Sequence, residues 1–440
     1  MSRSKGLRRK KTQIQTRVAS KMGGVLAALT LLLFTSTAVA QSINARLNTA
    51  VYTWQSVPGT DSSASHIRGY QVVNLSVGRI FTPRLSFHTY AAVMSDFASN
   101  ILDDPRTWLY DAYFSYVLPK AEVRLGRQRV FAGVGFGTID GVRVLAGLFG
   151  RAELDVFAGS QMPLKTDFSI DSWDDSHMFG ARLRSVAWRR TRLSLSYVEK
   201  ARARKAYVAP GEFTADTWLL TKINALQQRR IGVDVWQGLG ASSSLAARLD
   251  YDLLQSRVQR AEVNGRTALG SFQFGLDYIF RNPLVDANSI FSVFAQESNW
   301  EVAGRVLYLF TPATGVFVRL AHVGLEGAST NRITFGFRSK GGYVGLSTNN
   351  GYGGDRWGVV GDYRWRLSKK LWLNLGSNYG IYRYYGLDGD WEHTLAAYLG
   401  ASYWLRRGFR LDAELQGLQN RHVSSDLRFL FRLNTNLRKR

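Results

Sequence analysis

The sequence predicts an all-β protein, an antiparallel up-and-down transmembrane β-barrel of about 22 strands, within a range of about 18 to 24. Three patterns lead to this prediction. Apolar and polar residues alternate through segments of roughly nine to thirteen residues, the length that a tilted strand needs to cross a bilayer. Short and long connections alternate between these segments, and large aromatic residues recur near both ends of the apolar faces. A membrane-spanning barrel combines all three patterns.

The first forty residues predict a signal peptide. They hold eight Lys and Arg and no acid, and an apolar run follows at 25–34. Small residues at Ala38 and Ala40 fit a cleavage site before Gln41. The alternative is a transmembrane anchor, but the apolar run is too short to span about 30 Å of hydrocarbon. We therefore expect residues 1–40 to be removed near Ala40 and residues 41–440 to form one barrel domain.

The segment 356–367 shows the alternation most clearly. Its odd-numbered positions are glycine, apolar or aromatic and include Trp357 and Trp365, whereas its even-numbered positions include Asp362 and Arg364. Successive side chains of a strand point to opposite faces, so one face is apolar and the other is charged. By itself this fits either the core of a sandwich or a barrel with lipid outside and charges inside. We expect Asp362 to pair with Arg364 or with an arginine of a neighbouring strand.

The connections favour the barrel, because short turns such as 81–83 and 368–370 alternate with longer loops. Membrane barrels have short periplasmic turns and longer outer loops, whereas a sandwich has no reason to follow that order. We expect long extracellular loops near 161–175, 199–227 and 281–299.

Two connections carry more specific predictions. The order of short and long connections requires a tight hairpin within 253–265, and without it the count falls to about 20 strands. Helical periodicity is nearly absent, but Trp218, Leu219 and Ile223 permit a short amphipathic helix over 214–228.

Aromatic residues bracket several apolar faces. Trp357 and Trp365 lie eight residues apart on one face, which matches two interfacial girdles about 20 Å apart on a tilted strand. The pairs Trp108 with Tyr116 and Trp391 with Tyr403 repeat this bracketing. Aromatic residues are common in any β-sheet core, so the repetition carries the argument.

Composition excludes several classes of function. Cysteine is absent, which excludes disulfides, thiolate nucleophiles and cysteine-bound metals. The six histidines show no metal-binding spacing, and no Gly-x-Ser-x-Gly motif occurs. We therefore expect no enzyme activity, cofactor or metal. The net charge of +24 is mostly scattered arginine rather than a basic arm, so we expect no nucleic-acid partner.

The chain resembles the large bacterial outer-membrane barrels of the porin and polysaccharide-export type. The segment VRLGRQ at 123–128, the glycine-rich 133–137 and the turn 138–141 are similar to a region of alginate-export-like barrels. This resemblance implies a Gram-negative outer membrane, with its lipid and the barrel assembly machinery as partners. Such barrels often end in an aromatic residue, whereas this chain ends in Arg440.

The charged faces of the strands predict the lining of the lumen. We expect arginines and acids to share this surface, with arginines in excess. Two interpretations stay open: a lattice of cross-strand ion pairs that stiffens the wall, or guanidinium groups that attract carboxylate, phosphate or sulfate. The candidate lining residues are Arg124, Arg182, Arg184, Arg248, Arg305, Arg319, Arg332, Arg356, Arg364, Arg410, Arg428, Arg432, Asp250, Asp252, Asp362, Asp412 and Glu414.

These patterns predict an outer-membrane channel or export conduit that passes small or polymeric anionic solutes passively. Either of the loops 199–227 and 281–299 could narrow the lumen by folding inward. The alternative is a barrel that sheathes a periplasmic partner, such as a secretion or electron-transfer component. A homo-oligomer is also compatible with the sequence.

Overall fold

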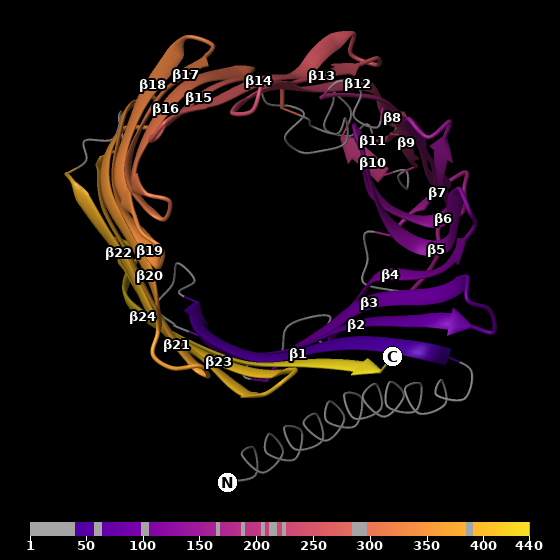
Figure 1. The fold of residues 1–440 in the computed structure, drawn as a ribbon, viewed down its shortest axis with the longest axis horizontal. Coiled ribbons are helices and arrows are strands. Elements are labelled where there is room, and N and C mark those ends of the chain that lie inside the picture. The colour runs from indigo at the N-terminus through magenta and orange to yellow at the C-terminus, as the bar shows by residue number, and fades with distance from the viewer. Residues whose placement is uncertain are drawn as a thin grey trace.

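The strands of the computed structural model form one closed barrel. The structure describes residues 40–56, 64–97, 105–163, 168–185, 190–203, 207–210, 218–221, 226–283, 297–383 and 390–439. One antiparallel sheet holds 22 strands, and pairing of β1 (Ala40–Ser56) with β24 (Val423–Lys439) closes it into the ring seen in Figure 1. The predicted fold class and strand number are confirmed.

The other strands of the barrel follow one another around the ring in chain order. They are β2 (Ala64–Ile80), β3 (Leu85–Asp96), β4 (Arg106–Val117), β5 (Ala121–Ala132), β6 (Gly135–Leu148), β7 (Ala152–Gln161), β8 (Ser176–Ser185), β9 (Thr191–Arg202), β12 (Leu226–Leu239), β13 (Ser243–Asp252), β14 (Arg257–Leu269), β15 (Phe272–Arg281), β16 (Asn299–Thr311), β17 (Thr314–Leu325), β18 (Ala328–Arg338), β19 (Gly342–Gly351), β20 (Asp355–Arg366), β21 (Leu371–Arg383), β22 (Glu392–Arg406) and β23 (Phe409–Asn420).

The two rims of the barrel differ in the length of their connections. The short-turn rim consists of the connections 81–84, 118–120, 149–151, 186–190, 240–242, 270–271, 312–313, 339–341, 367–370 and 407–408, each two to five residues long. The long-loop rim consists of the remaining connections, and all the longer ones lie there, including 162–175, 203–225 and 282–298. Because neighbouring strands are antiparallel, alternate connections fall on opposite rims, as the sequence predicted.

The connection 203–225 contains a second, two-stranded sheet. Its strands β10 (Tyr207–Pro210) and β11 (Trp218–Thr221) pair with each other, and Figure 1 shows both within the outline of the ring. The predicted helix over 214–228 is therefore wrong in the part that the structure describes, where 218–221 and 226–228 are extended. The pairing partner of β11 lies about ten residues earlier in the chain. The periodicity of apolar residues within one segment cannot reveal such a partner.

Two further predictions are settled by the register. The hairpin within 253–265 exists, since β13 and β14 are joined by the turn 253–256. The bracket of Trp108 and Tyr116 is wrong, because a bulge opposite Tyr90 and Ala91 shifts the register. One extra residue in a strand moves every later side chain to the other face, so Trp108 and Tyr116 lie on opposite faces.

The signal peptide stays a prediction, because residues 1–39 lie outside the described residues. Parts of the loops 161–175, 199–227 and 281–299 lie outside them as well, including 284–296. No helix in the described part of the chain is long and apolar enough to cross a membrane.

Candidate functional site: the inner wall and an inward hairpin

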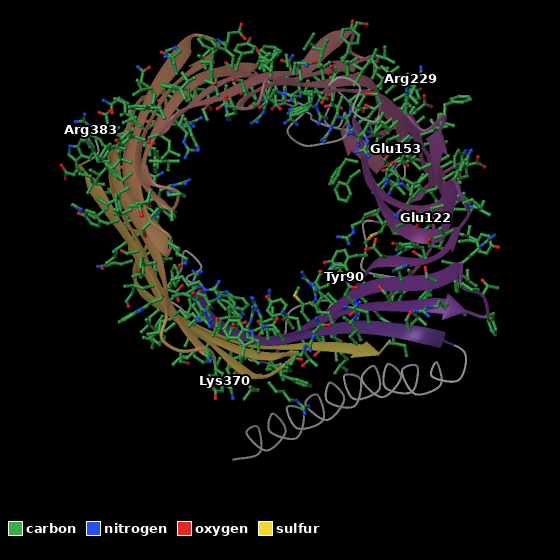
Figure 2. The ribbon with its side chains drawn as sticks, viewed as in Figure 1. Tyr90, Glu122, Glu153, Arg229, Lys370 and Arg383 are labelled. Atoms are coloured by element: carbon green, nitrogen blue, oxygen red, sulfur yellow. The ribbon has the colours of Figure 1, made fainter. Side chains whose placement is uncertain are left out.

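Figure 2 gives the direction of the two faces of the sheet. Tyr90, Glu122 and Glu153 lie toward the inside of the ring, whereas Arg229 and Arg383 lie toward the outside. Residues opposite each other in a ladder share a face, so the register carries the inward face from strand to strand. The inward face can be followed in this way from Glu153 around to β24.

The register puts every candidate lining residue on this inward face. They are Arg124 on β5, Arg182 and Arg184 on β8, Arg248, Asp250 and Asp252 on β13, Arg305 on β16, Arg319 on β17, Arg332 on β18, Arg356, Asp362 and Arg364 on β20, Arg410, Asp412 and Glu414 on β23, and Arg428 and Arg432 on β24.

Many of these arginines belong to ion pairs within the wall. The ion pair often joins two residues of one strand that are two positions apart, as in Arg124 with Glu122 at 2.8 Å and Arg428 with Asp426 at 2.7 Å. Side chains two positions apart in a strand point to the same face, which brings the charges together. Across strands, Arg319 pairs with Glu301. Part of the inner wall is therefore an ion-pair lattice.

Other inward arginines have no acidic partner within 4.0 Å among the described residues. Arg182 donates only to the hydroxyl of Ser194, at 2.8 Å. Arg305 and Arg364 stack on the rings of Phe317 and Trp372, with the guanidinium carbon 5.1 and 4.4 Å from the ring centroids. Arg356 and Arg432 also lack an ion pair in the described part of the wall. No described acid forms an ion pair with these five guanidinium groups.

Two acids have partners that the sequence did not predict. The partner of Asp362 is the hydroxyl of Tyr398, which donates to its carboxylate, rather than an arginine. Tyr398 lies on β22, two strands away from β20, and its hydroxyl reaches across β21. The prediction considered only residues of the same or the neighbouring strand, so it missed this partner. Asp252 accepts hydrogen bonds from the backbone N–H groups of Leu254 and Gln255, and so it stabilises a turn.

The hairpin of β5 and β6 leaves the wall. Pairing of β5 with β4 ends at Arg127, and pairing of β6 with β7 begins only at Ile139. In the strand ladders, residues 129–132 pair only with residues 135–138, and we call residues 128–138 the inward tip. Gly126, with φ of 123°, lies at the bend, where a Cβ would come within 2.4 Å of the Ala112 carbonyl oxygen. A residue with a side chain would be strained there.

An apolar cluster holds the inward tip against the wall. Val130, Ala132 and Val134 of the tip pack with Phe157 of β7 and Met178 of β8, and Ile139 and Val198 complete the cluster. All are at most 3% exposed. Because Phe157 and Met178 belong to the inward face, the tip lies inside the barrel.

Hydrogen bonds extend this contact to later strands. The N–H of Val134 donates to Ser196 Oγ on β9 at 3.1 Å. Arg230 on β12 donates to the carbonyl of Val134 at 3.3 Å, and Arg248 on β13 reaches the carbonyl of Gly133 at 3.4 Å. The tip therefore crosses the inner surface from β7 to β13 and is fixed at its end by two arginines.

The opposite side of the tip faces the lumen. Phe131 and Phe136 are 60% and 61% exposed, and their rings stack against each other 5.3 Å apart. Arg129 pairs with Asp111 at 2.6 Å, and its guanidinium carbon lies 5.1 Å from the centroid of the aromatic ring of Tyr90. The Tyr90 side chain points into the barrel. A hollow between Phe131 and the wall is lined by Arg143, Asp155, Arg182 and Arg184.

Sequence reasoning missed Arg127 and Asp140 at the base of the tip. They form a two-point ion pair with both N–O distances at 2.7 Å, and both side chains are at most 6% exposed. Arg127 also donates to the carbonyl of Ser169 in the connection 162–175, at 2.8 Å. A signal was present, because Arg127, Arg129 and Asp140 occupy positions that alternation assigns to lipid, where charges are costly.

Comparison with known proteins gives the fold. No protein-family model matches the chain, and neither does any curated protein. Among solved structures, a P pilus tip assembly intermediate from E. coli, PapC-PapD-PapK-PapG, is similar with a TM-score of 0.53 at 9% identity, covering 90% of this chain and 61% of that chain. The PapC translocation pore matches at 0.47 and 10% identity, covering 90% and 99%, and Pseudomonas aeruginosa OccK2 at 0.42 and 12%, covering 91% and 99%.

At such identities the likeness concerns the fold alone. The resemblance to large barrels is confirmed at that level. The narrower resemblance of 123–141 to alginate-export-like barrels stays a prediction.

Proposed function

We propose that the chain is an outer-membrane channel or export conduit that passes anionic solutes, small or polymeric, by passive diffusion. The observation that carries this proposal is the set of inward arginines without acidic partners, such as Arg182, Arg305 and Arg364, inside a closed 22-stranded barrel. A barrel of this size encloses a wide lumen. Its low-dielectric wall focuses the field of the unpaired charges into that lumen.

The two classes of arginine have different roles in this proposal. Arginines paired with acids, such as Arg124 and Arg428, stiffen the wall and contribute little net field. Unpaired guanidinium groups offer several N–H donors in a planar fork that suits carboxylate, phosphate and sulfate oxygens. A solute then passes from one unpaired arginine to the next without binding tightly to any of them.

The inward tip narrows this conduit, and the sequence did not suggest this element; that the loops 199–227 and 281–299 narrow it stays a prediction. It occupies lumen space beside β7 to β13, and Phe131, Phe136 and Arg129 are the groups it presents to a passing solute. The sheet of β10 and β11 is a second inward element of the connection 203–225.

Single-channel recording of the refolded full chain in a planar bilayer tests the proposal. We expect open-channel currents and, under a KCl gradient, a reversal potential that shows chloride preference over potassium. Changing Arg182, Arg305 and Arg364 together to Gln should preserve conduction and reduce the chloride preference.

Arg229→Gln provides the matched control for that experiment. Arg229 lies on the outer surface and pairs with Glu199 at 2.7 Å, so its removal should leave selectivity unchanged. A barrel that prefers potassium would contradict the anionic preference. A stable barrel that never conducts would contradict the channel and favour the alternative of a sheath for a periplasmic partner.

A further inference from the structure

The short-turn rim carries charge of one sign. Every charged residue in its ten connections is Lys or Arg, and no Asp or Glu occurs in them. Arg84, Lys120, Arg151, Lys340, Lys369 and Lys370 are all exposed. None of these six has an acidic partner within 4.0 Å in the described part of the chain. The rim is therefore a ring of unneutralised positive charge.

At the long-loop rim, some of the described bases are paired with acids. Arg383 pairs with Asp355 at 2.9 Å, and Arg421 pairs with Glu392. Its connections also hold acids, among them Asp171, Asp174 and Glu326, which have no salt bridge with a described residue. The connections of the two mouths therefore differ in charge, because those of the short-turn rim hold bases alone, whereas those of the long-loop rim also hold acids.

The positive charge of the short-turn rim continues into the bore. Arg366 and Arg364 end β20 next to the connection 367–370, and both guanidinium groups lie over Trp372, 5.5 and 4.4 Å from the ring centroid. Arg338 ends β18 next to the connection 339–341 and lies on the inward face. These inward arginines face the lumen, so membrane lipid cannot neutralise them.

We infer that the short-turn mouth is the loading side for anions, and that the barrel therefore rectifies ionic current. This inference rests on the proposed channel function and adds an asymmetry to it. Fixed positive charge raises the local concentration of anions at one mouth, while acids at the other mouth raise that of cations. Current is largest when each ion enters from the mouth where it is concentrated. The field does not pump, because it changes local concentrations without supplying energy.

Salt concentration separates this mechanism from steric causes of asymmetry. Screening lengths are about 10 Å at 0.1 M salt and about 3 Å at 1 M, so rim charges act over the mouth only at low salt. A surface potential of about one kT changes the local anion concentration about threefold. We therefore expect a current ratio of about three between opposite voltages in 0.1 M KCl, and a ratio of about one in 1 M KCl.

The experiment needs a known orientation of each inserted barrel. The chain contains no cysteine, so Ser271→Cys places a single exposed thiol on the short-turn rim without changing its charge. A bulky, membrane-impermeant maleimide added to one chamber then identifies the chamber that faces this rim, because labelling reduces the current. We expect the larger current at the voltage polarity that drives chloride into the barrel from the chamber facing the short-turn rim.

Charge reversal at the rim then tests the cause. Changing Lys120, Lys340, Lys369 and Lys370 together to Glu should abolish or invert the rectification, while the same four positions changed to Arg should retain it. A conducting, chloride-selective barrel whose current ratio is near one in 0.1 M KCl, or is unaffected by the Glu set, would overturn this inference and leave the proposed channel intact. A barrel that does not conduct would contradict both the proposed channel function and the inferred rectification.

Discussion

At the scale of single residues, the pair of Arg127 and Asp140 is the most enclosed charge interaction in the candidate site. Both side chains are nearly fully buried, and they are joined by two parallel hydrogen bonds. The remaining terminal nitrogen of Arg127, Nη1, is buried without a protein partner among the described residues. Burying a charge costs free energy, so each of the two buried side chains needs the opposite charge of the other.

We expect Asp140→Asn to destabilise the barrel by about 3 kcal/mol, because it leaves the Arg127 charge buried and uncompensated. The double variant Arg127→Met, Asp140→Leu should be destabilised less than this single variant, since no charge is left behind. Urea unfolding in detergent micelles, followed by tryptophan fluorescence, measures both.

Arg421→Gln is the control for this comparison. Arg421 pairs with Glu392 at the surface with its side chain 61% exposed, and exposed pairs contribute about 0–1 kcal/mol. Equal loss of stability from Asp140→Asn and Arg421→Gln would show that burial does not govern the Arg127–Asp140 pair.

At the scale of elements, the inward tip depends on close backbone contact at its base. A Cβ at Gly141 would lie 2.1 Å from the Ala158 carbonyl oxygen on the next strand, a backbone atom that cannot rotate away. We expect Gly141→Ala to separate β6 from β7 and to release the tip from the wall, with a loss of about 1–3 kcal/mol. The measurable result is a larger and noisier open-channel conductance.

Gly417→Ala is the matched variant, because a Cβ at Gly417 meets nothing within 4 Å. It should leave the conductance unchanged. Identical conductance of the two variants would mean that the tip does not narrow the lumen.

Alternation predicted the strands but not the tip, for a physical reason. Period-2 patterning assigns residues to two faces, and it cannot say whether an apolar face meets lipid or another layer of protein. Val130 and Ala132 are apolar at positions that alternation assigns to the lumen, while Arg129 and Phe131 share the face that it assigns to lipid. The apolar inward face and the charges on the presumed lipid face together mark where the hairpin leaves the membrane wall.

The candidate lining residues could be assigned to a face from sequence, but their partners could not. The face follows from the parity of positions in each strand, as for Arg248 and Asp250. Partners depend on the register between strands and on side-chain reach, as the bond between Tyr398 and Asp362 shows. Whether an arginine is paired decides its contribution to the field, so the distribution of free charge required the structure.

At the scale of the whole molecule, the barrel is thicker on one side than on the other. The inward tip forms a second layer over β7, β8 and β9, whereas no described element covers β17, β18 and β19 on the inside. Amide groups under a second layer open to water less often than those of a single exposed wall.

We expect backbone amides of β7 to β9 to exchange hydrogen at least about tenfold more slowly than those of β17 to β19, a difference of about 1.4 kcal/mol in opening free energy. Hydrogen–deuterium exchange with mass spectrometry on the refolded barrel measures this. Gly141→Ala should reduce the difference. Equal protection of the two sectors would contradict a stably docked tip.

The pairing of β1 with β24 has a consequence for the order in which the molecule is made. Asn48 and Asn434, whose side chains hydrogen-bond across this seam at 2.9 Å, are 386 residues apart in the chain. Contacts so distant in sequence form slowly, because a very long loop must close first. The tip needs only β7 to β13 as its support, and those strands follow it directly. We therefore expect the strands around the tip, with their own apolar cluster, to fold early. One edge of β1 stays unpaired until β24 pairs with it at the end.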